Sequence, residues 1–205
     1  MTRDDSTLLL AWRDGDSACG EELFERHYAA VQRFFSNKVQ EDLGDLVQAT
    51  FMACLEKVDG LQKAASFRSF LFGVARFELL HYYRRRSKRE TPQDMGELTV
   101  FDLDPSPSRI IAQREEGRLL LEALRHIPID LQIVLELTYW EQATSAEMAD
   151  VLGIPEGTVK SRVRRARDKL ELAMAQLAET DALLRSTQAN LADWAANVRP
   201  KASKT

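Results

Sequence analysis

A run of basic residues near the C-terminal end of the chain has the composition and spacing of a phosphate-binding helix. Residues 160–169 contain a single acid, Asp168, and six bases: Lys160, Arg162, Arg164, Arg165, Arg167 and Lys169. On a helical wheel, Val159, Val163, Ala166 and Leu170 form one apolar stripe, while Ser161, Arg164 and Arg165 lie on the opposite side. We therefore expect one face to pack against a core and the other to contact phosphates.

A second, shorter helix is predicted directly upstream, in the sequence ATSAEMADVLG. Thr144 and Glu147 have the spacing of a capping box, and Gly153 can end the helix in a left-handed conformation. Pro155 suits the first position of the next helix, where its missing N–H costs nothing. A helix, a tight turn and a basic helix together predict a helix-turn-helix, whose second helix lies in the major groove of DNA. The alternative, a solvated helical hairpin, does not explain why the outer face lacks acids that would pair with its bases.

Aromatic and basic residues are interleaved in another region, residues 67–89. Such a mixture suits the opening of a duplex, because splayed bases stack on aromatic faces while cations hold the phosphates. Phe70 and Val74 are expected to pack in the core. The candidate DNA-contacting residues of this region are Arg76, Phe77, Tyr82, Tyr83, Arg84 and Arg85.

The elements that must position these residues are all predicted to be helices. Apolar residues recur at helical spacing before residue 89 and after residue 117, and no stretch alternates as a strand would. Between them, residues 90–116 contain three prolines and seven acids against two bases, which is typical of a flexible linker. We therefore predict an all-α fold with two small helical domains joined by a flexible acidic linker. The predicted parts are an N-terminal domain (1–89), the linker (90–116), a helix-turn-helix domain (117–178) and a tail (179–205) with one helix.

Several classes of function are not expected from the composition. The 205 residues have a net charge of -4 and contain no apolar run long enough for a membrane span or a signal peptide, so a cytoplasmic location without membrane insertion is expected. Cys19, Cys54 and the three histidines lack the spacing of a zinc site, so we expect structural thiols, no metal and no cofactor. No nucleophile–base pair or phosphate loop suggests an enzyme.

Residues 127–170, IPIDLQIVLELTYWEQATSAEMADVLGIPEGTVKSRVRRARDKL, resemble the C-terminal promoter-binding domain of bacterial RNA polymerase sigma factors, especially the extracytoplasmic-function (ECF) type. The resemblance implies that this domain reads the upstream promoter element. The contact positions that it implies are Thr158, Lys160, Ser161, Arg162, Arg164 and Arg165. A stand-alone transcriptional regulator of the response-regulator kind shares the TVK helix start, so this motif alone leaves both classes open.

The first helical block favours the sigma factors. Its segment DLVQATF resembles the part of the family that docks on the clamp coiled coil of core RNA polymerase, with Asp45, Leu46 and Gln48 at the matching contact positions. A response regulator would instead place alternating strands and helices before its helix-turn-helix. The resemblance implies binding to core RNA polymerase and promoter DNA, promoter recognition, DNA melting and transcription initiation. Because many relatives are held inactive by an anti-sigma factor, such a regulator is a candidate partner.

The chain departs from the family where relatives capture a flipped base of the downstream promoter element. Phe77 stands where asparagine is usual, His81 stands where aspartate is common, and the loop at residues 60–67 lacks the usual Phe-Arg-Gly start. The base preferred at this element is therefore left open. A relaxed linker of this length averages only about 30 Å between its ends. We therefore expect the polymerase to hold the two DNA-reading domains apart.

Overall fold

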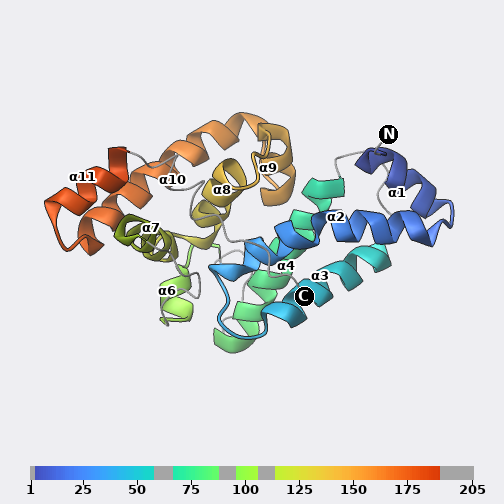
Figure 1. Ribbon diagram of the computed structural model, residues 1–205, viewed down its shortest axis with the longest axis horizontal. Helices are drawn as coiled ribbons and strands as arrows, with labels where there is room; N and C mark the ends of the chain where they lie inside the picture. The colour runs from blue at the N-terminus through green and yellow to red at the C-terminus, as the bar shows by residue number, and fades with distance from the viewer. Residues whose placement is uncertain (1–2, 58–66, 88–95, 106–113, 190–205) are drawn as a thin grey trace.

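The computed structural model describes residues 3–57, 67–87, 96–105 and 114–189, and in these ranges every regular element is a helix, as predicted. Figure 1 shows α1 to α4 on one side of the molecule, α7, α10 and α11 on the other, and α8 and α9 between them. The helices are α1 (Asp5–Arg13), α2 (Ser17–Ser36), α3 (Leu43–Lys57), α4 (Phe67–Ser87), α6 (Val100–Leu103), α7 (Glu115–Arg125), α8 (Ile129–Tyr139), α9 (Ser145–Leu152), α10 (Glu156–Leu177) and α11 (Asp181–Ala189).

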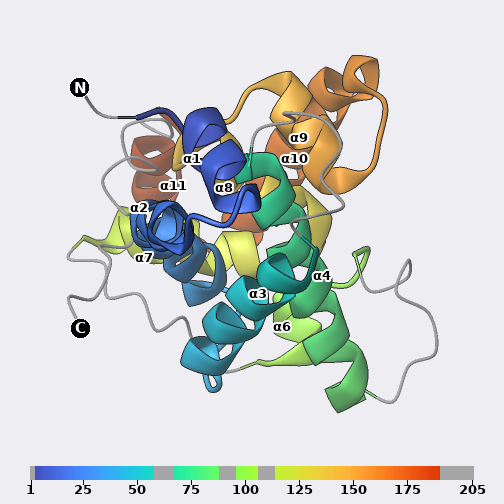
Figure 2. The same ribbon diagram turned by 90° about the vertical axis from the view of Figure 1, so that its right-hand side faces the viewer.

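Helices α1 to α4 form the N-terminal bundle. Two aspartates begin its first helices, since the Asp4 carboxylate accepts a hydrogen bond from the N–H of Thr7 and Asp16 caps α2. Figure 2 shows α3 and α4 side by side. The core of the bundle consists of aromatic and aliphatic side chains. Its fully buried side chains include Leu23, Val31, Phe35, Phe67, Leu71 and Leu79.

Both cysteines are buried in this bundle, and burial raises the pKa of the Cys54 thiol to about 12. A hydrogen bond to Asp16 raises the pKa of the Cys19 thiol. Because the thiolate is the reactive form, alkylation of Cys54 by iodoacetamide at pH 8 should be roughly a thousandfold slower in the native protein than in urea. Mass spectrometry after timed alkylation measures both rates. Rapid labelling of Cys54 in the native protein would contradict its burial.

The predicted helix-turn-helix is confirmed in α9 and α10. Thr144 and Glu147 form the capping box at the start of α9, and Gly153 ends it with a left-handed backbone (φ 64°, ψ 38°). The predicted stripe of α10 faces the core, with Val159, Ala166 and Leu170 buried and Val163 packed beside them. The prediction for Pro155 is wrong by one residue, since it is the N-cap and α10 begins at Glu156.

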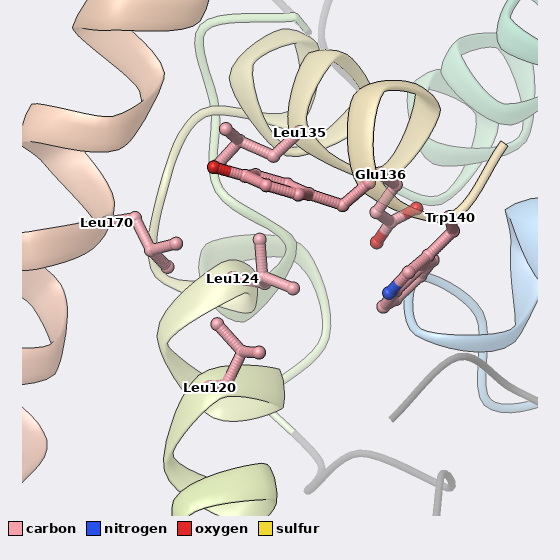
Figure 3. A pocket seen from close by; sticks show the side chains of 7 residues that line it. Leu120, Leu124, Leu135, Glu136, Trp140 and Leu170 are labelled. Atoms are coloured by element: carbon pink, nitrogen blue, oxygen red, sulfur yellow. The ribbon is translucent and has the colours of Figure 1, made fainter. Parts of the chain in front are cut away.

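A small pocket remains between α7, α8 and α10. Figure 3 shows its mostly apolar lining, in which the carboxylate of Glu136 is the charged group. The lining residues are Leu120, Leu124, Leu135, Glu136, Tyr139, Trp140 and Leu170. Glu136 therefore sits against apolar side chains, where an ionised carboxylate needs a partner.

Part of the predicted linker is folded. Residues 96–105 lie against the start of α8, where the N–H of Ile129 donates to the carbonyl of Leu98 (2.8 Å). The short helix α6 buries Val100, and the ring of Phe101 stacks on His126 with 4.1 Å between the centroids. Apolar side chains therefore anchor this segment. The linker residues 90–95 and 106–113 lie outside the described residues.

The described part of the predicted tail, α11, packs on α7. The hydroxyl of Ser186 donates to Glu116 (3.0 Å), and Thr187 is buried. The tail residues 190–205 lie outside the described residues. None of the helices in the described ranges combines the length and the hydropathy of a membrane-spanning segment.

Candidate nucleic-acid and polymerase interfaces

The outer face of α10 is open to solvent in its first turns. Five of the six predicted upstream contacts are exposed there: Thr158, Lys160, Ser161, Arg164 and Arg165. The hydroxyl of Ser161 donates to the carbonyl of Thr158 (2.8 Å), so its oxygen remains able to accept a further hydrogen bond. Because the opposite stripe is buried, α10 can present these side chains only outward.

Some basic side chains of α10 contact other groups of the same protein. Arg162 is half-buried, and its guanidinium lies 3.7 Å from a carboxylate oxygen of Asp130. Arg165 lies 3.5 Å from Glu97 in the folded part of the linker. The guanidinium of Arg167 lies 5.6 Å from the centroid of the Tyr139 ring, so this arginine contacts α8 of its own domain.

On α4, Phe77 is the most exposed of the predicted aromatic contacts, with 55% of its surface accessible. Its ring stacks on His81 with an interplanar angle of 10° and a centroid distance of 6.0 Å. The ammonium nitrogen of Lys57 lies 5.5 Å from the centroid of the Phe77 ring. An exposed aromatic face beside a cation can stack a nucleic-acid base and attract its phosphate. The atypical loop at residues 60–67 lies, apart from Phe67, outside the described residues.

Tyr82 and Tyr83 do not present their rings to solvent in this structure. Tyr83 is 1% exposed, and its hydroxyl donates to the backbone carbonyl of Lys38. Tyr82 shares a helical face with the buried Leu71 and Ala75, and burial raises the pKa of both tyrosines. Both rings would have to be uncovered before they could stack on a base.

The predicted basic contacts of α4 differ in their surroundings. Arg84 is half-buried and Arg85 is exposed. Arg76 instead forms two hydrogen bonds with the Asp130 carboxylate, at 2.8 Å from Nε and 2.9 Å from Nη2. A DNA phosphate would have to displace Asp130 before it could bind Arg76 in the same way.

The predicted polymerase contacts on α3 are divided between surface and core. Asp45 and Gln48 are exposed, whereas Leu46 is 3% exposed and packs inside the bundle. Met52 and Leu55 continue the exposed face at helical spacing. Our sequence reasoning missed this apolar extension, although the spacing 45, 48, 52, 55 contains the signal.

Two family models match separate parts of the chain. The model described as Sigma-70 region 2 matches residues 23–89, which contain most of α2 and all of α3 and α4. The model described as Sigma-70, region 4 matches residues 117–170, which include the helix-turn-helix. The chain belongs to the ECF group of sigma-70 factors.

Curated relatives of this sigma factor span most of its length. The ECF RNA polymerase sigma-E factor of Haemophilus influenzae is 22% identical over 176 residues, which cover 82% of this chain and 93% of the relative. The ECF RNA polymerase sigma factor SigM of Mycobacterium tuberculosis is 27% identical over 177 residues, covering 85% and 87%.

Two solved structures share the fold of this sigma factor. CnrH, solved in complex with the cytosolic domain of CnrY, matches with a TM-score of 0.60 and 22% identity over 85% of this chain and 99% of CnrH. The sigma factor RpoE of Bartonella quintana, solved with the anti-sigma factor NepR, matches with a TM-score of 0.57 and 22% identity, covering 77% and 98%.

Family membership decides the general activity. A sigma factor binds core RNA polymerase and promoter DNA and directs transcription initiation, and it is not itself an enzyme. A stand-alone response regulator would have a receiver domain before its helix-turn-helix. Residues 23–89 of this chain match Sigma-70 region 2 instead, so that alternative is set aside.

Proposed function

We propose that α10 reads the upstream promoter element. The observation that carries this assignment is the exposed polar and basic row on α10, opposite a buried stripe in a capped helix-turn-helix. Side chains near the start of the helix would recognise the nucleotide bases, and the remaining basic side chains would hold phosphates. The proposed contacts are Thr158, Lys160, Ser161, Arg162, Arg164 and Arg165.

We assign the downstream element to the middle and the C-terminal part of α4, within an N-terminal domain of residues 1–89. Phe77 is its best-supported contact, because its exposed ring is stacked on His81 and lies near Lys57. Arg84 and Arg85 would hold the separated strand. Arg76, Tyr82 and Tyr83 would join them only after the packing around them opens.

Two further roles complete the proposal. Asp45 and Gln48 would contact core polymerase, with Met52 and Leu55 adding apolar surface to the same face. An anti-sigma factor is a proposed regulator, because both structural neighbours were solved with a binding partner and RpoE with an anti-sigma factor. The proposed location is the cytoplasm, where polymerase and promoter DNA are found.

The test of the docking face measures binding to purified core polymerase, together with run-off transcription on a promoter library. Replacing Asp45 and Gln48 together by alanine should weaken core binding at least about tenfold, since two polar contacts at a docking face are lost. Glu21→Ala, an exposed acid on α2, is the control and should transcribe normally. Unchanged core binding by the double variant would remove α3 from the interface.

A further inference from the structure

The exposed ring of Phe77 has a stacked neighbour on one side along α4 and open space on the other. His81, one turn further along the helix, stacks on this ring with an interplanar angle of 10°. One turn before it stands Gly73, and a Cβ built there would meet no side chain or other segment of the described residues within 4 Å. Helical side chains lean toward the N-terminus, so the Phe77 ring inclines toward this space. The described residues therefore leave the side of the ring opposite His81 open.

Three cations lie near the Phe77 ring or further along the same side of α4. The ammonium nitrogen of Lys57 lies 5.5 Å from the ring centroid, at the end of α3, which Figure 2 shows beside α4. Arg84 and Arg85 follow Phe77 by seven and eight residues, roughly 10–12 Å further along the helix axis. Within the described ranges none of the three forms an ion pair, so all remain available to phosphates.

The chemistry of the Phe77 ring suits the face of a base and not its edge. A phenylalanine side chain has no hydrogen-bond donor or acceptor, so it cannot read the polar groups on a base edge. Asparagine, which is usual at this position in the family, carries both. Every base has a face that stacks on an aromatic ring, and preferences among bases then come from stacking strength, which favours the larger purines.

We propose that Phe77 and His81 form a platform that captures one unpaired base of the downstream element by its face, accepting all four bases with a modest preference for purines. The proposal rests on the assignment of the downstream element to α4 made above. The captured base fills the space beside Gly73, and Lys57 moves from the ring to a phosphate of the same strand. Lys57 is exposed, so its present contact with the ring is weak and easily displaced.

Capture by stacking predicts that the presence of a base matters more than its identity. The probe is the strongest promoter from the run-off library, with each of the four bases or an abasic nucleotide placed in turn along its melted downstream element. At the captured position, an abasic nucleotide should reduce the equilibrium constant for promoter opening by native holoenzyme about tenfold, whereas exchanging the bases should change it by no more than about threefold. Phe77→Leu should abolish this sensitivity to base removal.

Two results of this experiment would overturn the platform. The first is a position where Phe77→Leu does abolish the effect of base removal but the four bases differ by tenfold or more, because the site would then read an edge. The second is the absence of any position where the effect of base removal depends on Phe77.

Gly73→Leu tests the open side of the ring without changing the platform itself. The leucine side chain occupies the space beside Phe77, so opening should fall about tenfold with any base and remain at the same low level on the abasic promoter. Leucine favours a helix more than glycine does, so the variant should fold. Ala175→Leu, which adds a leucine at an exposed position of α10, is the control and should open promoters normally. Normal opening by Gly73→Leu would contradict the proposal.

A fluorescent base separates stacking on DNA from a contact with protein. 2-Aminopurine, whose fluorescence is quenched by stacking, should be dim at the captured position in the native open complex and bright with Phe77→Leu or Gly73→Leu. Both variants should bind core polymerase as the native chain does. Weakened core binding by Phe77→Leu would mean that the ring contacts protein, and would overturn the platform.

Failure of the platform differs from failure of the downstream assignment. If α4 does not bind the downstream element, replacing Arg84 and Arg85 together by alanine leaves promoter opening unchanged. If only the platform is wrong, this double variant impairs opening whereas Gly73→Leu does not.

Discussion

Replacing Glu136 by alanine is expected to lower the free energy of unfolding by about 3–5 kcal/mol. The variant leaves the ammonium of Lys38, which is 0% exposed, without its carboxylate partner. The side-chain amide of Gln132, which donates to Glu136 (2.8 Å), loses its acceptor as well. Urea denaturation followed by circular dichroism measures the change.

Replacing both partners should have a much smaller effect than replacing one. In the combined variant Lys38→Met, Glu136→Leu, apolar side chains fill the same space and no charge is desolvated, so we expect stability within about 1 kcal/mol of the native chain. Glu171→Ala, at an exposed position of α10, should change stability by no more than about 0.5 kcal/mol. A cost for Glu136→Ala that matches this surface control would mean that Lys38 reaches water.

Replacing Arg164 and Arg165 together by alanine is expected to reduce promoter-dependent transcription roughly a hundredfold. The estimate follows because each good arginine contact with DNA contributes about 1–3 kcal/mol. Binding to core polymerase should remain unchanged, since both side chains lie on α10 and far along the chain from the α3 docking face. The decisive measurements are run-off transcription and promoter binding by the assembled holoenzyme.

Salt dependence adds a second measure of the same contacts. If either arginine neutralises a phosphate, the slope of log affinity against log salt should become shallower by about one for each such contact. Lys169→Ala removes a base from the same helix outside the proposed contacts and serves as the control. Normal transcription by the double arginine variant would exclude this face of α10 as the promoter reader.

The helix-turn-helix could be predicted because its signals are local. The capping box of Thr144 and Glu147, the left-handed Gly153 and the buried stripe of α10 all depend on residues within a few turns of one another. Helical periodicity in the same way predicted that the N-terminal domain is made of helices. The family resemblance added the functional meaning of these elements.

The ion pairs between the N-terminal bundle and α8 or the residues just after it could not be predicted, because the partners are far apart in the chain and ion pairs leave no periodic pattern. Lys38 and Glu136 are 98 positions apart, and Arg33 and Glu141 are 108 apart. The burial of the proposed contact residues Tyr82, Tyr83 and Leu46 was not predicted for a related reason. Residue type identified these side chains as able to bind, but tertiary packing decided that they are buried.

The docking face that we propose on α3, with Asp45 and Gln48, is accessible in the structure as it stands. Neither side chain is covered by the second domain, so the first encounter requires no rearrangement. Separation of the domains can then follow as a slower, unimolecular step on the surface of the enzyme. If docking through these two residues comes first and separation of the domains second, we expect holoenzyme assembly to show two kinetic phases, of which only the first accelerates with polymerase concentration.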